Sequence, residues 1–539
     1  MALNHLDYLY YPYETTRQTT IARNGMVAAS QPLAAQAGLS ILQQGGNAID
    51  AAIAAAATLT VVEPTSNGIG GDAFALVWVK DKLYGLNGSG HSPASLSIEE
   101  LKKRGHSEIP TYGFTPVTVP GAPGAWAELS RRFGKLPLKD VLAPAIQYAE
   151  EGFPISPVLG KFWSAAAEKF KHLLKGDEFN HWFETFAPEG RAPAIGEVWS
   201  SKGHAETLRK IADTNAETFY HGEIADEIDN FSKEYGGFIR KSDLENYHPE
   251  WVDPISVDYR GYDVWEIPPN GQGIVALSAL NILKGFDLKE KEAVDTYHKQ
   301  MEAMKLAFAD GHKFVADDAY MDVSCDDLLS EEYAELRRSL ITDQAMQPEA
   351  GTPPKGGTVY LAAADKDGNM VSFIQSNYMG FGSGLVVPGT GIALQNRGHN
   401  FSLEEGHVNS LAGNKRSYHT IIPGFLTKDN KPIGPFGVMG GFMQPQGHVQ
   451  VVMNTIDFHL NPQATLDSPR WQWMKDRTVW VEPNFPAHVA EALKRKGHHI
   501  EVQLETGAFG RGQIIWRDYE TGTLYGGTES RTDGTISAY

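Results

Sequence analysis

The stretch between residues 355 and 401 has a pattern of apolar runs separated by a polar turn, and the rest of the chain is organised around it. An apolar run from Thr358 to Ala364 ends in the polar turn 365–369, and a second β-rich run follows from Met370 to Tyr378. Two such runs around a glycine-containing turn predict a β-hairpin. The pair Gly356-Gly357 therefore comes immediately before a strand whose first side chain is a threonine hydroxyl.

Other periodic segments predict a chain that mixes helices with short strands. Asn47 is expected to cap a buried, alanine-rich helix. That helix is expected over 48–59, and further helices near residues 31–44, 120–133, 138–151, 163–191, 205–214, 224–235, 273–284, 294–312, 446–457 and 487–496. Further strands are expected at 73–78, 82–86, 421–427 and 434–439, and a strand pair around 257–267. Residues 341–357 are rich in proline and glycine and predict a polar loop, where a cut site would be exposed.

Composition excludes several classes of protein. The 539 residues are 42% hydrophobic and 10% aromatic, as in a globular protein with more than one ordinary core. With 47 basic and 66 acidic residues, the net charge is −19, which opposes binding to nucleic acid or to an anionic membrane. No apolar run reaches the ~18 residues of a membrane span, and the N-terminus lacks a signal-peptide pattern. We therefore expect a cytoplasmic protein without membrane contact.

Several residues that could carry other chemistry favour plainer interpretations. The one cysteine, Cys325, has acidic neighbours that do not lower a thiol pKa, so it is expected to be structural. The scattered histidines, including His298 and His312, lack metal-ligand spacing, and no metal or cofactor is expected. The glycine cluster 68–71 lacks the lysine and spacing of a phosphate-binding loop.

The Gly357-Thr358 junction is suited to self-cleavage. A glycine carbonyl without a neighbouring Cβ is open to attack by the adjacent hydroxyl. Hydrolysis of the resulting ester would leave Thr358 with a free α-amine whose pKa is about 7.7–8.0. That amine can act as the general base for the hydroxyl of the same residue.

From these residues the chain is identified as similar to the γ-glutamyltranspeptidases. Thr358 to Asn369, the segment 381–384, Gly391-Ile392, Asn396 and Phe401 resemble the start of that family's small subunit, and the likeness extends from about Gly25 to Tyr539. These enzymes are N-terminal-nucleophile hydrolases that cut themselves before a threonine. The resemblance implies an α+β fold, a four-layer αββα sandwich, built jointly by residues 1–357 and 358–539. The two fragments would stay associated, as one heterodimer or as a dimer of heterodimers.

The resemblance also implies roles for individual residues. Thr358 would be the nucleophile, Ser376 the hydroxyl residue that supports it, and Gly440 with Gly441 the oxyanion hole. The acceptor of the acyl group would be water or an amine such as an amino acid.

The residues that would bind the substrate depart from the family pattern. The family's carboxylate-binding arginine corresponds to Ser89. Ungapped counting places Tyr378, Arg397 and Asn400 where the family has its Asn, Gln and Asp partners for the substrate ammonium. The family's Ser-Ser pair corresponds to His419 and Thr420. An arginine at one of these positions would repel an ammonium and attract a carboxylate.

Three functions remain open at this point. The first is a self-processing threonine amidohydrolase or acyltransferase that cleaves γ-glutamyl amides such as glutathione. The second is a glutaryl-type (cephalosporin) acylase for anionic acyl amides without an α-ammonium. The third is a non-catalytic homologue. The intact Gly357-Thr358 junction opposes the third.

Overall fold

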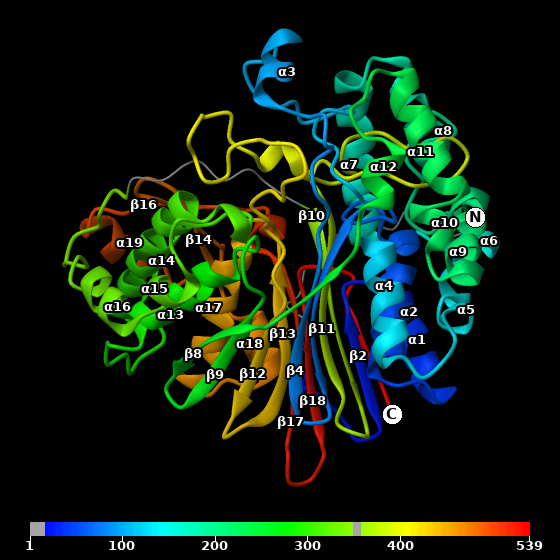
Figure 1. Ribbon diagram of the computed structural model, residues 1–539. Coiled ribbons are helices and arrows are strands. Elements are labelled where there is room, and N and C mark those ends of the chain that lie inside the picture. The colour runs from blue at the N-terminus through cyan, green and yellow to red at the C-terminus, as the bar shows by residue number, and fades with distance from the viewer. Residues whose placement is uncertain (1–16, 349–356) are drawn as a thin grey trace.

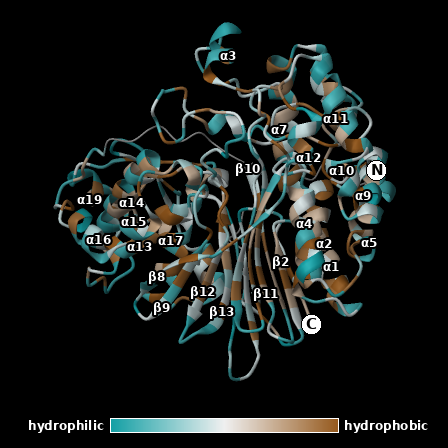
Figure 2. Ribbon diagram, in the orientation of Figure 1, coloured by the Kyte–Doolittle hydropathy of each residue, from teal (hydrophilic) through white to brown (hydrophobic). Residues whose placement is uncertain are grey.

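The computed structural model describes residues 17–348 and 357–539. Two seven-stranded sheets lie face to face in the middle of the molecule, and helices cover the outer face of each (Figure 1). The architecture is an αββα sandwich, as predicted. In Figure 2 the strands between the layers carry many hydrophobic positions, whereas the outlying helix α3 (Ile98–Lys103) is mostly hydrophilic.

Each sheet combines strands from both parts of the chain. The first has the order β1-β18-β17-β13-β12-β9-β8 and the second β19-β2-β10-β11-β3-β4-β7. The strands of the first sheet are β1 Thr20–Ala22, β8 Ile255–Tyr259, β9 Tyr262–Glu266, β12 Gly424–Lys428, β13 Lys431–Met439, β17 Arg511–Arg517 and β18 Leu524–Thr528. Those of the second are β2 Gly25–Ala29, β3 Asp72–Val79, β4 Lys82–Gly88, β7 Glu250–Val252, β10 Gly357–Asp365, β11 Met370–Tyr378 and β19 Thr535–Ala538.

Two small sheets lie outside the sandwich. One has three strands in the order β14-β15-β16, and the other pairs β5 with β6. Their strands are β14 Trp471–Lys475, β15 Thr478–Val481, β16 His499–Val502, β5 Phe153–Pro154 and β6 Val198–Trp199.

The helices form two outer layers with separate hydrophobic cores. One core joins β2, β3, β10 and β11 to the helices that precede β7, except α3: α1 Pro32–Gln43, α2 Ala48–Val62, α4 Ala122–Phe133, α5 Leu138–Val141, α6 Ala143–Glu151, α7 Pro157–Leu173, α8 Asn180–Phe186, α9 Lys202–Thr214, α10 Glu217–Tyr220, α11 Glu223–Glu234 and α12 Lys241–Glu245. The other core joins the β13 sheet to α13 Gly273–Leu283, α14 Val294–Phe314, α15 Cys325–Leu328, α16 Glu331–Arg338, α17 Met443–Ile456, α18 Pro462–Asp467 and α19 Ala487–Arg495.

Side chains of β10 alternate between two cores. Val359, Leu361 and Ala363 pack toward the α1/α2 layer, whereas Tyr360, Ala362 and Ala364 pack between the two sheets. Successive strand residues point to opposite faces, so a fully apolar strand fits only where both faces are covered. The predicted hairpin 358–378 is therefore the central strand pair of its sheet.

Most of the predicted helices are confirmed, and two are divided. The segment expected over 163–191 contains the later part of α7 and the separate helix α8. Asn47 caps α2 in a reciprocal capping box with Asp50, as the sequence indicates. The single helix expected over 138–151 is two helices, because Leu142 ends α5 and Pro144 lies at the start of α6. In the described ranges, no helix combines the length and apolarity that a membrane crossing requires.

Candidate active site

The β10–β11 hairpin brings Thr358 and Ser376 together. Gly357 pairs with Tyr378 and Val359 with Gln375, so two residues of β11, Ser376 and Asn377, lie opposite Thr358 in a β-bulge. The Thr358 hydroxyl donates to Ser376 Oγ at 3.2 Å, and the Tyr378 amide donates to the same oxygen at 2.8 Å. Thr358 is 1% exposed and Ser376 is fully buried, so their positions are fixed by the strand pair.

Gly440 and Gly441 form the turn between β13 and α17. Their φ angles are +136° and +62°, a region that favours glycine. The Gly441 carbonyl accepts from the side chain of Gln272 at 2.9 Å, and Gln272 also donates to the Thr420 carbonyl at 2.6 Å. This fixes the Gly-Gly turn against the segment that contains His419 and Thr420.

Arg397 is a buried cation beside the hairpin end. Its side chain is 1% exposed, Nη1 donates to Thr420 Oγ1 at 2.7 Å, and the guanidinium lies 4.3 Å from the centre of the Tyr378 ring. Within the described residues, Nε and Nη2 of Arg397 have no hydrogen-bond partner. Burial lowers the pKa of Arg397 to about 10, so it stays charged at neutral pH. Two donors of a buried cation are thus left for a bound anion.

Asp72, to which we assigned no role from the sequence, is the acidic group of this site. It accepts from His419 Nε2 at 2.9 Å, from Gln395 at 2.8 Å and from the Gly90 amide at 3.1 Å. Burial raises its pKa to about 7, although the charge of Arg397 opposes the rise. Burial and then Arg397 lower the pKa of His419 well below its usual value, so this histidine is neutral.

Ser89 and Asn400 use their side chains in contacts within the protein. Ser89 Oγ donates to Asn87 Oδ1 at 2.7 Å, and its neighbour Gly90 contacts Asp72. Asn400 accepts from the Tyr378 hydroxyl at 2.8 Å and donates to the Tyr418 carbonyl at 2.8 Å. The residues counted onto the substrate pocket that form one cluster through direct contacts are Tyr378, Arg397, Asn400 and Thr420. His419 joins this cluster through Asp72, whose charge acts on Arg397.

A cavity of about 750 Å³ lies beside Gly440. Residues that follow β11, helix α7 and the start of β17 all contribute to its wall; they include Met379, Phe381, Lys169, Phe170 and Arg511. From the sequence we expected residues 163–191 to be a helical segment with no functional role. The structure instead places residues of α7, and also Arg511, in the wall of this cavity. The only signal in the sequence that could have indicated a role for this segment is its clustering of aromatic and basic residues.

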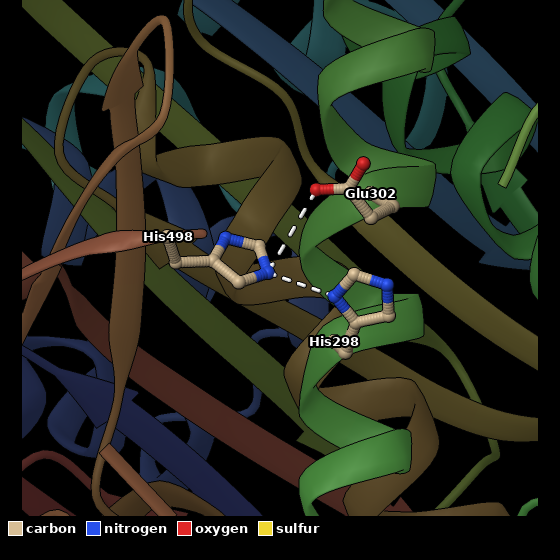
Figure 3. A group of neighbouring side chains, drawn as sticks. All are labelled: His298, Glu302 and His498. Atoms are coloured by element: carbon tan, nitrogen blue, oxygen red, sulfur yellow. Dashed lines mark hydrogen bonds and ion pairs between the residues drawn. The ribbon is translucent and has the colours of Figure 1, made fainter. Parts of the chain in front are cut away.

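A separate buried cluster contains the one group of described residues that resembles a metal site: His298, Glu302 and His498 (Figure 3). The ring nitrogens of the two histidines are 2.8 Å apart, and Lys305 Nζ lies 2.6 Å from Glu302 Oε1. His298 also contacts the Thr342 carbonyl at 2.7 Å. A lysine ammonium on the carboxylate opposes a bound cation. The contacts make this cluster an anchor for the segment around residues 342–346.

Comparisons with known proteins match nearly the whole chain. The sequence model of the family described as Gamma-glutamyltranspeptidase matches residues 34–539. The glutathione hydrolase-like YwrD proenzyme of Bacillus subtilis (strain 168) is 37% identical, over 96% of this chain and 99% of that protein. The oxamate amidohydrolase proenzyme of Klebsiella pneumoniae is 32% identical, over 97% of this chain and 99% of that protein.

Among solved structures, a cephalosporin acylase from Bacillus halodurans is similar over 99% of both chains, with a TM-score of 0.97 and 66% sequence identity. This chain therefore shares its fold with that cephalosporin acylase, while the printed names of its relatives refer to different compounds: glutathione, oxamate and cephalosporin.

Proposed function

The chain belongs to the γ-glutamyltranspeptidase family, and from this premise we propose that it is a self-processing threonine amidohydrolase for amides with an anionic acyl group. The family and the relatives named above are hydrolases and transferases of acyl groups. The names of two of these relatives describe proenzymes, which supports maturation by cleavage.

In the first step, Thr358 Oγ attacks the Gly357 carbonyl. The peptide C–N bond breaks, an ester forms on the hydroxyl, and the nitrogen of Thr358 becomes a free amine. Water then hydrolyses the ester. The products are fragments of 357 and 182 residues, the second beginning with Thr358.

In turnover, the freed α-amine takes the proton from Thr358 Oγ as this oxygen attacks the substrate carbonyl. The proton passes to the leaving nitrogen when the amide C–N bond breaks, and the acyl group stays on Thr358 as an ester. Water or an amine then takes the acyl group, and the hydroxyl is restored. Ser376, 3.2 Å from Thr358 Oγ1, holds the nucleophile, and the amides of Gly440 and Gly441 stabilise the oxyanion.

The observation that carries the choice of acyl group is Arg397. Its buried guanidinium has two donors without a partner among the described residues, and a carboxylate can accept from two such donors at once. Ser89 lacks the positive charge of the family's arginine. We therefore place the remote carboxylate of the acyl group on Arg397.

A γ-glutamyl group is the second candidate. It carries the same carboxylate, but its α-ammonium needs an acidic partner. Asp72 is the acid whose charge acts on Arg397, and its pKa of about 7 leaves it only partly ionised at neutral pH. Amides that lack the ammonium should therefore be hydrolysed at least as well as γ-glutamyl amides.

Three p-nitroanilides test this proposal: glutaryl, γ-glutamyl and butyryl. We expect glutaryl-p-nitroanilide to be hydrolysed at least as fast as the γ-glutamyl compound. Arg397→Ala should raise KM for the glutaryl substrate far more than for the neutral butyryl one, whereas the exposed Arg495→Ala serves as control. Preferential turnover of the γ-glutamyl compound would overturn the assignment of Arg397.

A further inference from the structure

The cavity beside Gly440 contains a second buried cation, Arg511. The register of β13 with β17 pairs Met439 with Arg511, so Arg511 lies next to the Gly-Gly turn. A Cβ built on Gly440 would be 3.1 Å from the Cα of Gly510, which shows how closely the two backbones approach. Arg511 therefore lies beside the predicted oxyanion hole, on the Gly440 side.

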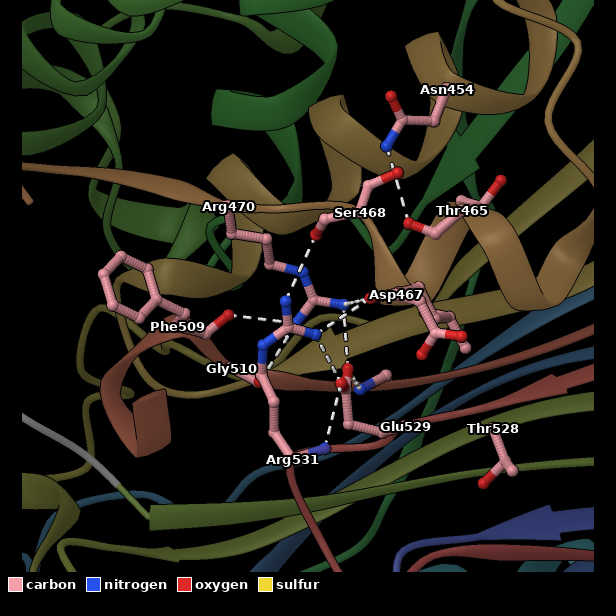
Figure 4. Close-up of polar contacts among 12 residues, drawn as sticks. Asn454, Thr465, Asp467, Ser468, Arg470, Phe509, Gly510, Thr528, Glu529 and Arg531 are labelled. Carbon is pink, nitrogen blue, oxygen red and sulfur yellow. Dashed lines mark hydrogen bonds and ion pairs between the residues drawn. The ribbon is translucent and has the colours of Figure 1, made fainter. Parts of the chain in front are cut away.

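The backbone around Arg511 is fixed by a buried charge network (Figure 4). Arg470 Nη1 donates to the carbonyls of Phe509 and Gly510 at 3.0 and 2.9 Å. Glu529 accepts from Arg470 and from the Gly512 amide, at 2.8 and 2.9 Å. Because both chain neighbours of Arg511, Gly510 and Gly512, are held in this way, the backbone that carries the Arg511 side chain is fixed in position.

The guanidinium of Arg511 is only partly satisfied. Its residue is 8% exposed, its Nη1 contacts Glu63 Oε1 at 3.3 Å, and its centre lies 5.1 Å from the Phe162 ring. Among the described residues, Nε of Arg511 has no hydrogen-bond partner. Glu63 also accepts a short hydrogen bond from Ser30 Oγ. A buried guanidinium has five donors, and one long contact leaves most of them available.

Besides Arg511, the described residues of the cavity wall include one further cation, Lys169, and one acid, Glu505. Lys169 lies 5.5 Å from the centre of the Tyr112 ring, and both residues line the cavity. Glu505 also lines it, but Lys161 Nζ is 2.6 Å from its carboxylate. Aromatic side chains, Tyr112, Phe170 and Trp480, complete the wall.

Arg397 and Arg511 approach the Gly-Gly turn from different sides. Gln272 links Gly441 to the Thr420 carbonyl, and Thr420 is the residue bonded by Arg397. Gly440 instead adjoins Gly510 and the cavity that Arg511 lines. A substrate whose carbonyl oxygen lies at the turn would have its acyl group on the Arg397 side and its amine in the cavity.

Resting on the proposed function, we propose that Arg511 binds a carboxylate on the leaving amine and so selects amines that carry an acid. The carboxylate accepts from the free donors of the guanidinium, and the aromatic wall packs against a flat amine. The same contact would favour an acid-bearing amine as acyl acceptor.

The test compares glutaryl amides of 3-aminobenzoate and of 3-aminobenzamide, which are similar in shape but differ in charge. The readout is the ratio of kcat/KM for the acid to kcat/KM for the neutral amide, with products separated by liquid chromatography. Arg511→Gln should lower this ratio roughly 10-fold, as expected for one charge-assisted hydrogen bond of about 1.4 kcal/mol. Arg511→Lys, which keeps the positive charge, should retain part of the preference for the acid over the neutral amide.

Glu63→Gln provides the opposite test because it keeps Arg511 and removes the carboxylate that contacts it, one of three whose charges act on this residue. It should raise the same ratio. The control is Lys175→Gln, which removes one charge from an exposed residue just after α7 that does not line the cavity. This control should leave the ratio as in the wild type.

Calorimetric titration with 3-aminobenzoate alone measures the site without turnover. Weaker binding to Arg511→Gln than to the wild type would support the role of Arg511, whether or not the amides are hydrolysed. If neither amide were hydrolysed by the wild type, that finding would refute the proposed function and not the role of Arg511. If both amides were hydrolysed and neither Arg511→Gln nor Glu63→Gln changed the ratio of their kcat/KM values, the proposed role of Arg511 would be refuted. Arg511 would then only form a structural ion pair.

Discussion

At the scale of single residues, the site depends on polar groups that the fold buries. Thr358, Ser376, Asp72 and Arg397 are all at most 1% exposed. Each has a partner that restrains it, and burial shifts the pKa values of Asp72 and Arg397 toward their uncharged forms. Such shifts of pKa are common where a site must bind or transfer charge.

Replacing Ser376 with alanine should slow both self-cleavage and turnover by ~10²-fold, the lower range for loss of a positioned partner in proton transfer. Ser376 Oγ accepts from the Thr358 hydroxyl and from the Tyr378 amide. Fragment formation on denaturing gels and kcat of the matured enzyme measure the two effects. Unchanged rates would mean that the contact is only structural, and Ser372→Ala, on the same strand face, is the matched control.

Binding of an anionic acyl group should weaken as the pH rises through about 7. The pKa of Asp72 is raised to about 7, so its carboxylate becomes charged in this range and offsets the charge of Arg397. We expect the inhibition constant of glutarate to rise roughly 3- to 10-fold between pH 6 and 8.5, as for a charge pair at the effective dielectric of a protein. Asp72→Asn should remove this part of the dependence.

The Thr358 α-amine titrates in the same pH range. The pH dependence of the inhibition constant that the wild type and Asp72→Asn have in common therefore reports the amine. The difference between the two pH dependences reports Asp72. For folding, a raised acid pKa favours the native state at low pH. This contribution is complete below the unfolded pKa of 3.8 and is lost as the pH rises through about 7.

At the scale of elements, the β10–β11 hairpin connects the site to the outer helical layer. Its turn residue Asp365 is 4% exposed and accepts from the amides of Ala48, Asp367 and Asn369 at 2.9, 2.9 and 3.0 Å. One carboxylate thus closes the turn and satisfies the first turn of α2. The hairpin register, and with it the Thr358–Ser376 contact, depends on this turn.

Asp365→Ala should lower the free energy of unfolding by about 1–3 kcal/mol, because several buried backbone donors lose their acceptor. Urea denaturation in a Thr358→Ala background measures the change without self-cleavage. The neighbouring Asp367→Ala is the control, since Asp367 is exposed. Equal midpoints for the two variants would show that Asp365 is not needed for the turn.

At the scale of the whole molecule, both sheets interleave the two predicted fragments. β10 pairs with β11 and with β2, and β11 pairs with β3. In the other sheet, β12 pairs with β9. Cleavage between Gly357 and Thr358 would cut β10 after its first residue, so the pairings of residues 359–365 with β11 and β2 would remain in place.

The 357- and 182-residue fragments should remain together after cleavage and separate only in denaturant. Size-exclusion chromatography of the matured enzyme, followed by denaturing gels, tests this, and the mass of the native species reports whether heterodimers pair further. Thr358→Ala should elute at a similar volume as one uncut chain. Fragments that separated in native buffer would contradict the interleaved arrangement.

The sequence by itself determined the local features of this protein. The hairpin around turn 365–369, the cap of α2 at Asn47 and the glycine pair before Thr358 each depend on residues a few positions apart, within reach of periodicity and turn chemistry. The resemblance to a known family added the fold and the list of site residues.

Only the tertiary structure decided which distant residues face one another. Asp72 contacts His419 across 347 positions of sequence, and Arg511 contacts Glu63 across 448. Arg397 is also buried by elements that the sheets bring together, and there its Nε and Nη2 have no partner among the described residues. Such contacts depend on strand order and layer packing, for which side-chain patterns along one segment carry no signal.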